Sequence, residues 1–214
     1  MKTIPLRSEK DLTQAVEEIG LLPLFAGKIP GFSTEEMTPR DMWFQDGVEG
    51  PWEWREALAA EGRVVYAKLF HGKAGFVSRE LFGHLANYRR QGYDFDARAD
   101  DGLVRETERR LYALIQRGCG RSDDMRKAFG GKGLESACTA LQMQTYIAIS
   151  GFERHINRRG EPYSWAIARY ALAEDLFGDL CVSAYDFTPE ASLEILCRRL
   201  SGWLTRDQAL WLLQ

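Results

Sequence analysis

The most constraining feature of this sequence lies between residues 103 and 170, where the spacing of hydrophobic residues changes from that of helices to that of strands. Residues 103–117 repeat apolar side chains at helical spacing, with Leu103, Leu111 and Ile115 expected to face inward, and Gly118 ends the pattern. Residues 122–129 and a segment starting near residue 133 show two further helical patterns. The period then becomes that of strands at 145–152 and 163–170, which flank a turn at 157–160. The segment therefore predicts three helices followed by a β-hairpin.

This order is typical of a winged helix-turn-helix, in which the third helix lies in the DNA major groove and the hairpin touches the backbone or minor groove. The N-terminal half has a looser version of it. A helix is expected at 9–19, a loop at 22–34, helices starting at residues 38 and 51, a hairpin at 63–77 and a helix at 79–88. Residues 94–101 are polar and acidic and are expected to form a linker.

We therefore expect an α+β, mainly helical protein with tandem winged helix-turn-helix-like units. The expected divisions are an N-terminal helical or winged-helix-like block at 1–102, a winged helix-turn-helix at 103–170, and a C-terminal helical segment at 171–214. The C-terminal segment is expected to contain helices at about 189–200 and 205–213, each preceded by a capping residue or proline.

The charge distribution favours a nucleic-acid partner even though the whole chain has a net charge of −3. Residues 103–170 carry 12 basic and 7 acidic side chains, whereas acidic side chains are in excess on both sides of this segment. A local concentration of positive charge is expected of a phosphate-binding face. A fluctuation of charge on a solvated surface is the alternative.

Candidate DNA-binding side chains lie on the third helix and on the hairpin tip. Hydroxyl and ammonium groups can hydrogen-bond base edges or phosphates, and guanidinium groups suit phosphates or a narrow minor groove. The candidates are Lys132, Ser136, Thr139, Arg154, His155, Arg158 and Arg159. A charged hairpin tip that only faces solvent is the alternative, and we take double-stranded DNA as the expected partner.

Several classes of protein are disfavoured by composition. No apolar run approaches the roughly 20 residues that span a bilayer, and the N-terminus is charged where a signal peptide would be apolar. We therefore expect a cytoplasmic protein that has no membrane partner. The four cysteines are far apart without a CxxC pair, and there are three histidines, so neither a metal site nor a cofactor is expected. The oligomeric state stays open.

The segment LESACTALQMQTYIAISGFER resembles part of the AlkZ/YcaQ group of bacterial DNA glycosylases, which are built from tandem winged helices. That group carries a Gln-x-Gln or Gln-x-Asp motif, and Gln142 and Gln144 match the first form. The stretch GRVVYAKLFHGKAGFV resembles the group's strand-turn-strand segment. The resemblance implies DNA binding and excision of alkylated bases, with Gln142 and Gln144 as catalytic residues beside the target sugar.

Three functions stay open on these grounds. DNA binding by a protein related to AlkZ-type glycosylases comes first, and the alternatives are a monofunctional glycosylase that uses Gln142 and Gln144, and a protein-interaction module. The two glutamines share a face only if the backbone between them is extended, because on a helix their directions differ by about 200°.

The aromatic side chains also allow more than one interpretation. Trp43, Phe44, Trp52 and Trp54 could stack on a base or form core, and Tyr163, Trp165 and Tyr170 are expected to pack inward or at an interface.

Overall fold

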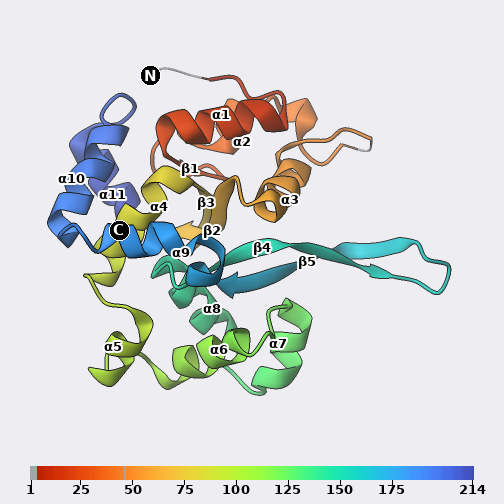
Figure 1. The fold of residues 1–214 in the computed structure, drawn as a ribbon. Helices are drawn as coiled ribbons and strands as arrows, with labels where there is room; N and C mark the ends of the chain where they lie inside the picture. The colour runs from red at the N-terminus through yellow and green to blue at the C-terminus, as the bar shows by residue number, and fades with distance from the viewer. Residues whose placement is uncertain (1–3, 46) are drawn as a thin grey trace.

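A computed structural model describes residues 4–45 and 47–214, with the exception of the side chains of residues 183 and 184. The chain is α+β and about half helical, and its described strands form one three-stranded and one two-stranded antiparallel sheet (Figure 1). Among the described residues, we find no helix with the length and hydrophobicity that a membrane span requires.

The N-terminal block places three strands beneath a set of helices. Its elements are α1 (Glu9–Ile19), β1 (Leu21–Pro23), α2 (Thr34–Met37), the 3-10 turn η1 (Arg40–Met42), α3 (Pro51–Glu61), β2 (Val64–Phe70) and β3 (Lys73–Ser78). The side chain of Ser8 accepts a hydrogen bond from the Asp11 N–H and so caps α1, and Gly20 ends that helix with a φ of 98°. The strands lie in the order β1-β3-β2, with Val77 of β3 between Leu21 and Val65.

The second block repeats much of this arrangement. Two connecting helices, α4 (Arg79–Arg90) and α5 (Phe95–Asp100), lead to α6 (Glu106–Gln116), α7 (Ser122–Phe129), α8 (Leu134–Met143), β4 (Ile147–Ile156) and β5 (Pro162–Leu172). The segment between α6 and α7 lies beside β5, where Arg121 forms an antiparallel bridge with Arg169 and the Tyr170 N–H donates to the Gly120 carbonyl at 2.8 Å. This segment therefore takes the position that β1 takes beside β3.

The two blocks pack against each other reciprocally. Helix α3 of the first block lies against β4 of the second, and α8 of the second lies against β2 of the first. Three C-terminal helices follow, α9 (Ala173–Ala184), α10 (Pro189–Leu200) and α11 (Arg206–Leu213), and α4 packs against α9 and α10. Buried residues of these helices belong to the same hydrophobic cluster as the N-terminal block, whereas α5 to α8 surround a second cluster.

A buried arginine joins α4, the start of β4, and α9. Arg90 is completely buried, and it donates hydrogen bonds to the Thr145 carbonyl at 2.7 Å, to the Thr145 hydroxyl at 3.1 Å and to Glu174 at 2.5 Å. Thr145 has a φ of 66°, which a residue with a β-branched side chain seldom adopts. Because a buried guanidinium needs acceptors on every side, Arg90 fixes the turn between α8 and β4.

The helix and hairpin predictions are largely confirmed, including the three helices and hairpin of residues 103–170 and the helices at 189–200 and 205–213. The linker prediction for 94–101 is wrong, because α5 forms there, capped by Asp94, and its Phe95 stacks on Tyr112 with ring centroids 3.6 Å apart. The loop prediction for 22–34 missed the last two residues of β1 and the first residue of α2, and the helix expected from residue 38 is only the 3-10 turn η1. Leu103 is 53% exposed, so its expected inward position is also wrong.

Candidate nucleic-acid interface

The hairpin formed by β4 and β5 extends well beyond the body of the protein (Figure 1). Its tip is built by Asn157, whose side-chain oxygen accepts hydrogen bonds from the N–H groups of Arg159 at 2.8 Å and Glu161 at 3.0 Å. The Asn157 amide also donates to the Glu161 carboxylate at 3.0 Å. These local hydrogen bonds form a compact turn that presents the two tip arginines.

The side chains of Arg158 and Arg159 are exposed, and neither has an ion-pair partner among the described residues. Arg154 differs from them, because its guanidinium lies 3.6 Å from the Glu56 carboxylate at the other block. His155 stacks on Tyr163, and its Nε2 lies 4.0 Å from an Asp123 oxygen. The sequence grouped these four side chains together, but only the two tip arginines lack an ion-pair partner among the described residues.

A network of ion pairs links both strands of the hairpin to α7 and to the segment before it. Arg121 contacts Asp123 at 3.0 Å and Glu153 at 3.1 Å, and Arg169 contacts the second oxygen of Glu153 at 2.5 Å. The hydrogen bonds that Arg121 donates lower the pKa of Asp123 to about 2. These two arginines are therefore neutralised by carboxylates. Sequence reasoning missed this network because its members come from α7, β4, β5 and the segment before α7.

The N-terminal end of α8 is open to solvent, while its C-terminal end is covered. Lys132 and Ser136 are exposed, and the Ser136 hydroxyl donates to the Gly133 carbonyl at 2.9 Å. Thr139 is half-buried, and its hydroxyl accepts a hydrogen bond from Lys68 Nζ of the other block at 3.4 Å. Only the first turn of α8 is thus free to meet a ligand.

Gln142 lies inside the protein, between the two blocks. Its side chain is completely buried, its Oε1 accepts the Lys68 N–H at 3.0 Å, and its Nε2 donates to the Cys138 carbonyl at 3.1 Å. Gln144 follows the end of α8 with φ −79° and ψ 0°, so the backbone between the glutamines is helical and their side chains diverge. Gln144 is half-buried, and its Oε1 is buried with no hydrogen-bond partner in the described structure.

Apolar side chains on the hairpin are exposed. Trp165 is 73% exposed, and Ile156 and Tyr163 are at least half exposed. The reason is that the end of the hairpin formed by β4 and β5 projects away from the helices (Figure 1). Trp165 and Tyr163 therefore do not pack inward, and an interface is the expectation that stays open for them, whereas Tyr170 is half-buried and packs against both hydrophobic clusters. Of the N-terminal aromatic residues, Trp54 is buried in the core and Phe44 is 60% exposed.

Within the described residues, no three His, Cys, Asp or Glu side chains come together in a way that could hold a metal ion. The interface offers cationic and apolar contact from the hairpin, together with the Lys132 ammonium group just before α8 and the Ser136 hydroxyl group in its first turn.

Comparison with known proteins identifies a family but no individual relative. No curated protein and no solved structure matches the chain significantly. The sequence profile of the family described as AlkZ related matches residues 6–213, so the match includes both helix-and-hairpin blocks and all three C-terminal helices. This chain therefore belongs to the AlkZ-related family.

Proposed function

We propose that the protein binds double-stranded DNA with the hairpin of β4 and β5 and the first turn of α8. The observation that carries this proposal is the position of Arg158 and Arg159, two exposed guanidinium groups at the end of a projecting hairpin that have no ion-pair partner among the described residues. Guanidinium groups bind phosphate oxygens with two parallel hydrogen bonds, and neutralising phosphates releases counterions from the duplex. Lys132 adds a third cation near the exposed end of α8.

The proposal treats each helix-and-hairpin block as a winged-helix unit and keeps the sequence-based divisions at 1–102, 103–170 and 171–214. Its support is the hairpin of β2 and β3 that follows α1, α2 and α3, with β1 beside β3, and the matching place of Gly120 and Arg121 beside β5. In such units the third helix enters the major groove. Because the C-terminal half of α8 is covered by β2, groove contact would come from Lys132 and Ser136 at the start of the helix, and not from Thr139.

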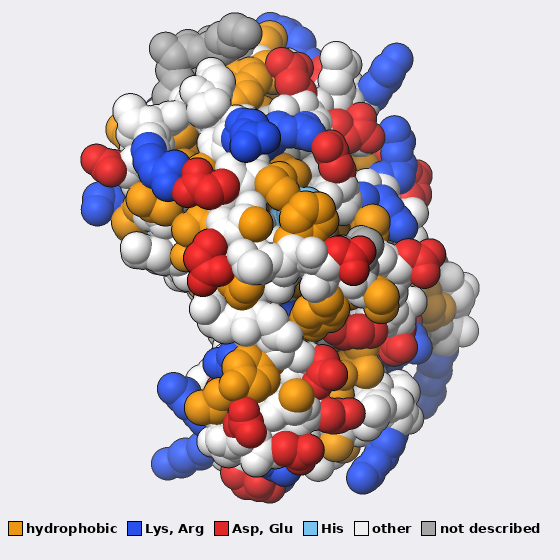
Figure 2. Space-filling view, turned by 60° about the vertical axis from the view of Figure 1, so that its left-hand side comes forward, with side chains coloured by type: hydrophobic (Ala, Val, Ile, Leu, Met, Phe, Trp, Pro, Cys, Tyr) orange, Lys and Arg blue, Asp and Glu red, His pale blue; other side chains and the backbone are white. Residues whose placement is uncertain are grey.

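The surface away from the hairpin offers less to a polyanion. On the face shown in Figure 2, acidic and basic side chains are interspersed, and no large field of one sign is present. Mixed charges on a surface favour solubility and give little attraction to phosphates. The electrostatic argument therefore selects the hairpin over this face.

Excision of a base by Gln142 receives no support from the arrangement of its contacts. A residue that acts on a bound nucleotide must reach it within hydrogen-bond distance, and both polar atoms of Gln142 are engaged inside the protein. We therefore propose DNA binding as the function. Release of free base from an alkylated duplex is a separate activity that needs its own assay.

A second candidate function, binding of another protein, is favoured by the exposed side chains of Ile156, Tyr163 and Trp165. Exposed apolar groups mark protein interfaces, but apolar wedges next to arginines are also used to enter the minor groove. The two candidates differ in whether the protein binds DNA at all.

An electrophoretic shift assay with plain and alkylated duplexes tests the proposal. The double variant Arg158→Glu/Arg159→Glu is compared with Lys10→Glu/Arg198→Glu, which changes the net charge equally on two exposed side chains of α1 and α10, far from the hairpin. The hairpin variant should bind at least about tenfold more weakly, and its slope of log affinity against log salt should be smaller by about 2.

Two outcomes would contradict the proposal. If wild type binds neither duplex at low ionic strength, the protein-interaction candidate replaces it. If the hairpin variant and the control variant lose affinity equally, the hairpin is not the contact surface. A duplex that is bound but releases no free base would fit the buried position of Gln142.

A further inference from the structure

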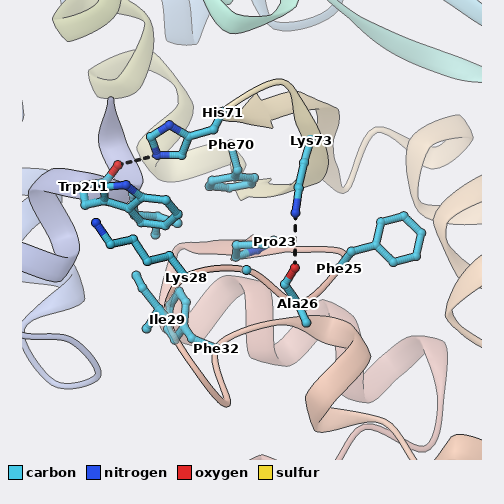
Figure 3. Close-up of a pocket in the computed structure, with 12 residues that line it drawn as sticks. Pro23, Phe25, Ala26, Lys28, Ile29, Phe32, Phe70, His71, Lys73 and Trp211 are labelled. Carbon is cyan, nitrogen blue, oxygen red and sulfur yellow. Dashed lines mark hydrogen bonds between the residues drawn. The ribbon is translucent and has the colours of Figure 1, made fainter.

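A pocket of about 340 Å3 lies on the N-terminal block, apart from the hairpin of β4 and β5. Three segments line it: the loop after β1, the turn between β2 and β3, and the end of α11 (Figure 3). This volume is near the lower end of the range for small-molecule sites, which suits a ligand of one or two rings.

The walls of the pocket are largely aromatic. Phe32 and Phe70 are buried beside it, while Phe25 and Trp211 are half-buried at its sides. Figure 3 shows these rings on different sides of one space, contributed by elements far apart in the sequence. A concave site with aromatic walls favours a flat apolar ligand, because ring faces and edges provide contact with little loss of side-chain entropy.

The indole of Trp211 is held in place before any ligand binds. His71 Nε2 lies 2.7 Å from the Trp211 carbonyl oxygen, and the two rings stack with centroids 4.2 Å apart and an angle of 20° between their planes. A carbonyl only accepts hydrogen bonds, so Nε2 is the donor. Fixing an aromatic wall in this way lowers the ordering cost that a ligand would otherwise have to meet.

The mouth of the pocket is positively charged. Lys28 and Lys73 line it and are exposed, and no Asp or Glu is among the described residues that line it. Lys28 Nζ lies 5.4 Å from the centroid of the Trp211 ring, and Lys73 Nζ lies 3.4 Å from the Ala26 carbonyl oxygen. Both ammonium groups can therefore meet a negative group at the mouth while a ring occupies the interior.

Two acidic side chains of α2 are hydrogen-bonded to the loop that lines the pocket, but neither is among the described residues that line it. Glu35 accepts a hydrogen bond from the Ala26 N–H and Glu36 accepts one from the Gly31 N–H, both at 2.8 Å. Their carboxylates are engaged in shaping the loop, and they border a different hollow together with Arg40.

We propose that this pocket binds a small aromatic anion, a one- or two-ring molecule that carries a carboxylate or a phosphate group. The ring would lie among Phe25, Phe32, Phe70 and Trp211, and the anionic group would lie between Lys28 and Lys73. This inference goes beyond DNA binding and does not depend on it, because no residue of the hairpin lines the pocket.

Calorimetric titration of the full chain with three probes tests the ligand class. The probes are naphthoate, which has a carboxylate, adenosine monophosphate, which has a phosphate, and naphthalenemethanol, which resembles naphthoate but is neutral. At least one of the two anions should give saturable binding, and whichever binds more tightly identifies the anionic group. Naphthalenemethanol should bind about tenfold more weakly than naphthoate, as expected for the loss of a charge-assisted contact. Failure of both anions to bind, or equal binding of naphthoate and its neutral analogue, overturns the proposal.

Variants locate the binding and separate it from DNA binding. Lys28→Met and Lys73→Met keep most of the aliphatic stem and should each weaken the binding of the anionic probe about tenfold. Lys10→Met, an exposed lysine on α1, should leave it unchanged, and so should Arg158→Glu/Arg159→Glu. Thermal unfolding should show that all these variants stay folded. Unchanged affinity in both pocket variants, or loss of affinity in the hairpin variant, would show that the probe binds elsewhere.

Discussion

Replacing Gln142 by leucine tests whether this side chain stabilises the contact between the two blocks. The carboxamide joins Lys68 of β2 to Cys138 of α8, and it is completely enclosed. Leucine is close in volume to glutamine and is a good helix former, so the change removes hydrogen bonds while packing and helix propensity change little.

The expected loss follows from the groups that remain. The Lys68 N–H loses its acceptor at the block interface, and leaving a buried donor unpaired costs about 1–3 kcal/mol. Lys68 itself is half-buried, so water can compensate in part, and we expect a loss of about 1–2 kcal/mol. For a chain of 214 residues this corresponds to a fall in Tm of about 2–8 °C.

Urea unfolding followed by circular dichroism measures this effect, with Gln116→Leu as the matched control. Gln116 is exposed at the end of α6, and its replacement should change the free energy of unfolding by less than about 0.5 kcal/mol. Equal stability of the two variants would refute our account of Gln142. So would a Gln142→Leu variant that keeps wild-type stability but loses release of alkylated bases, because the side chain would then act on substrate.

Three further predictions concern other contacts. Arg90→Met should lower the free energy of unfolding by about 3 kcal/mol, because it leaves Glu174 and the Thr145 carbonyl without their partner; a loss below about 1 kcal/mol in urea unfolding would contradict this. The pKa of Asp123 is lowered from 3.8 to about 2, so its contact with Arg121 stabilises the fold above pH 4 and is lost as the pH falls toward 2. Between pH 4 and pH 2 the Asp123→Asn variant should therefore lose less stability than wild type. If the urea midpoints of the two proteins fell in parallel with pH, the contact between Asp123 and Arg121 would not contribute to stability. A Cβ on Gly120 would lie 2.2 Å from the Tyr170 carbonyl oxygen, so Gly120→Ala should cost about 1–3 kcal/mol, whereas Gly202→Ala, which meets no atom within 4 Å, should be neutral; similar unfolding midpoints for both would be evidence against the close approach.

The amino-acid sequence determined the elements whose signals are local. The helices of residues 106–143 follow from apolar side chains at helical spacing and from the glycines that end the first two patterns, and the hairpin tip follows from Asn157 and Gly160. The positive tip could also be predicted, because Arg158 and Arg159 lie in a turn, and a turn at the end of a hairpin faces solvent whatever the rest of the chain does. Family membership was equally a property of the sequence.

Tertiary structure alone decided which side chains are free to act. Strand β1 has only three residues and exists because β3 pairs with it, and α5 is polar in composition but buries Phe95 against a helix that follows it. Gln142, a candidate catalytic residue in the sequence, is buried against β2, where its partner Lys68 lies 74 residues before it. Arg154 gained an acidic neighbour from α3, and the pocket beside Trp211 required three distant segments. Burial and pairing depend on which surfaces meet, and contacts between residues far apart in sequence leave no periodic signal by which a single sequence could reveal them.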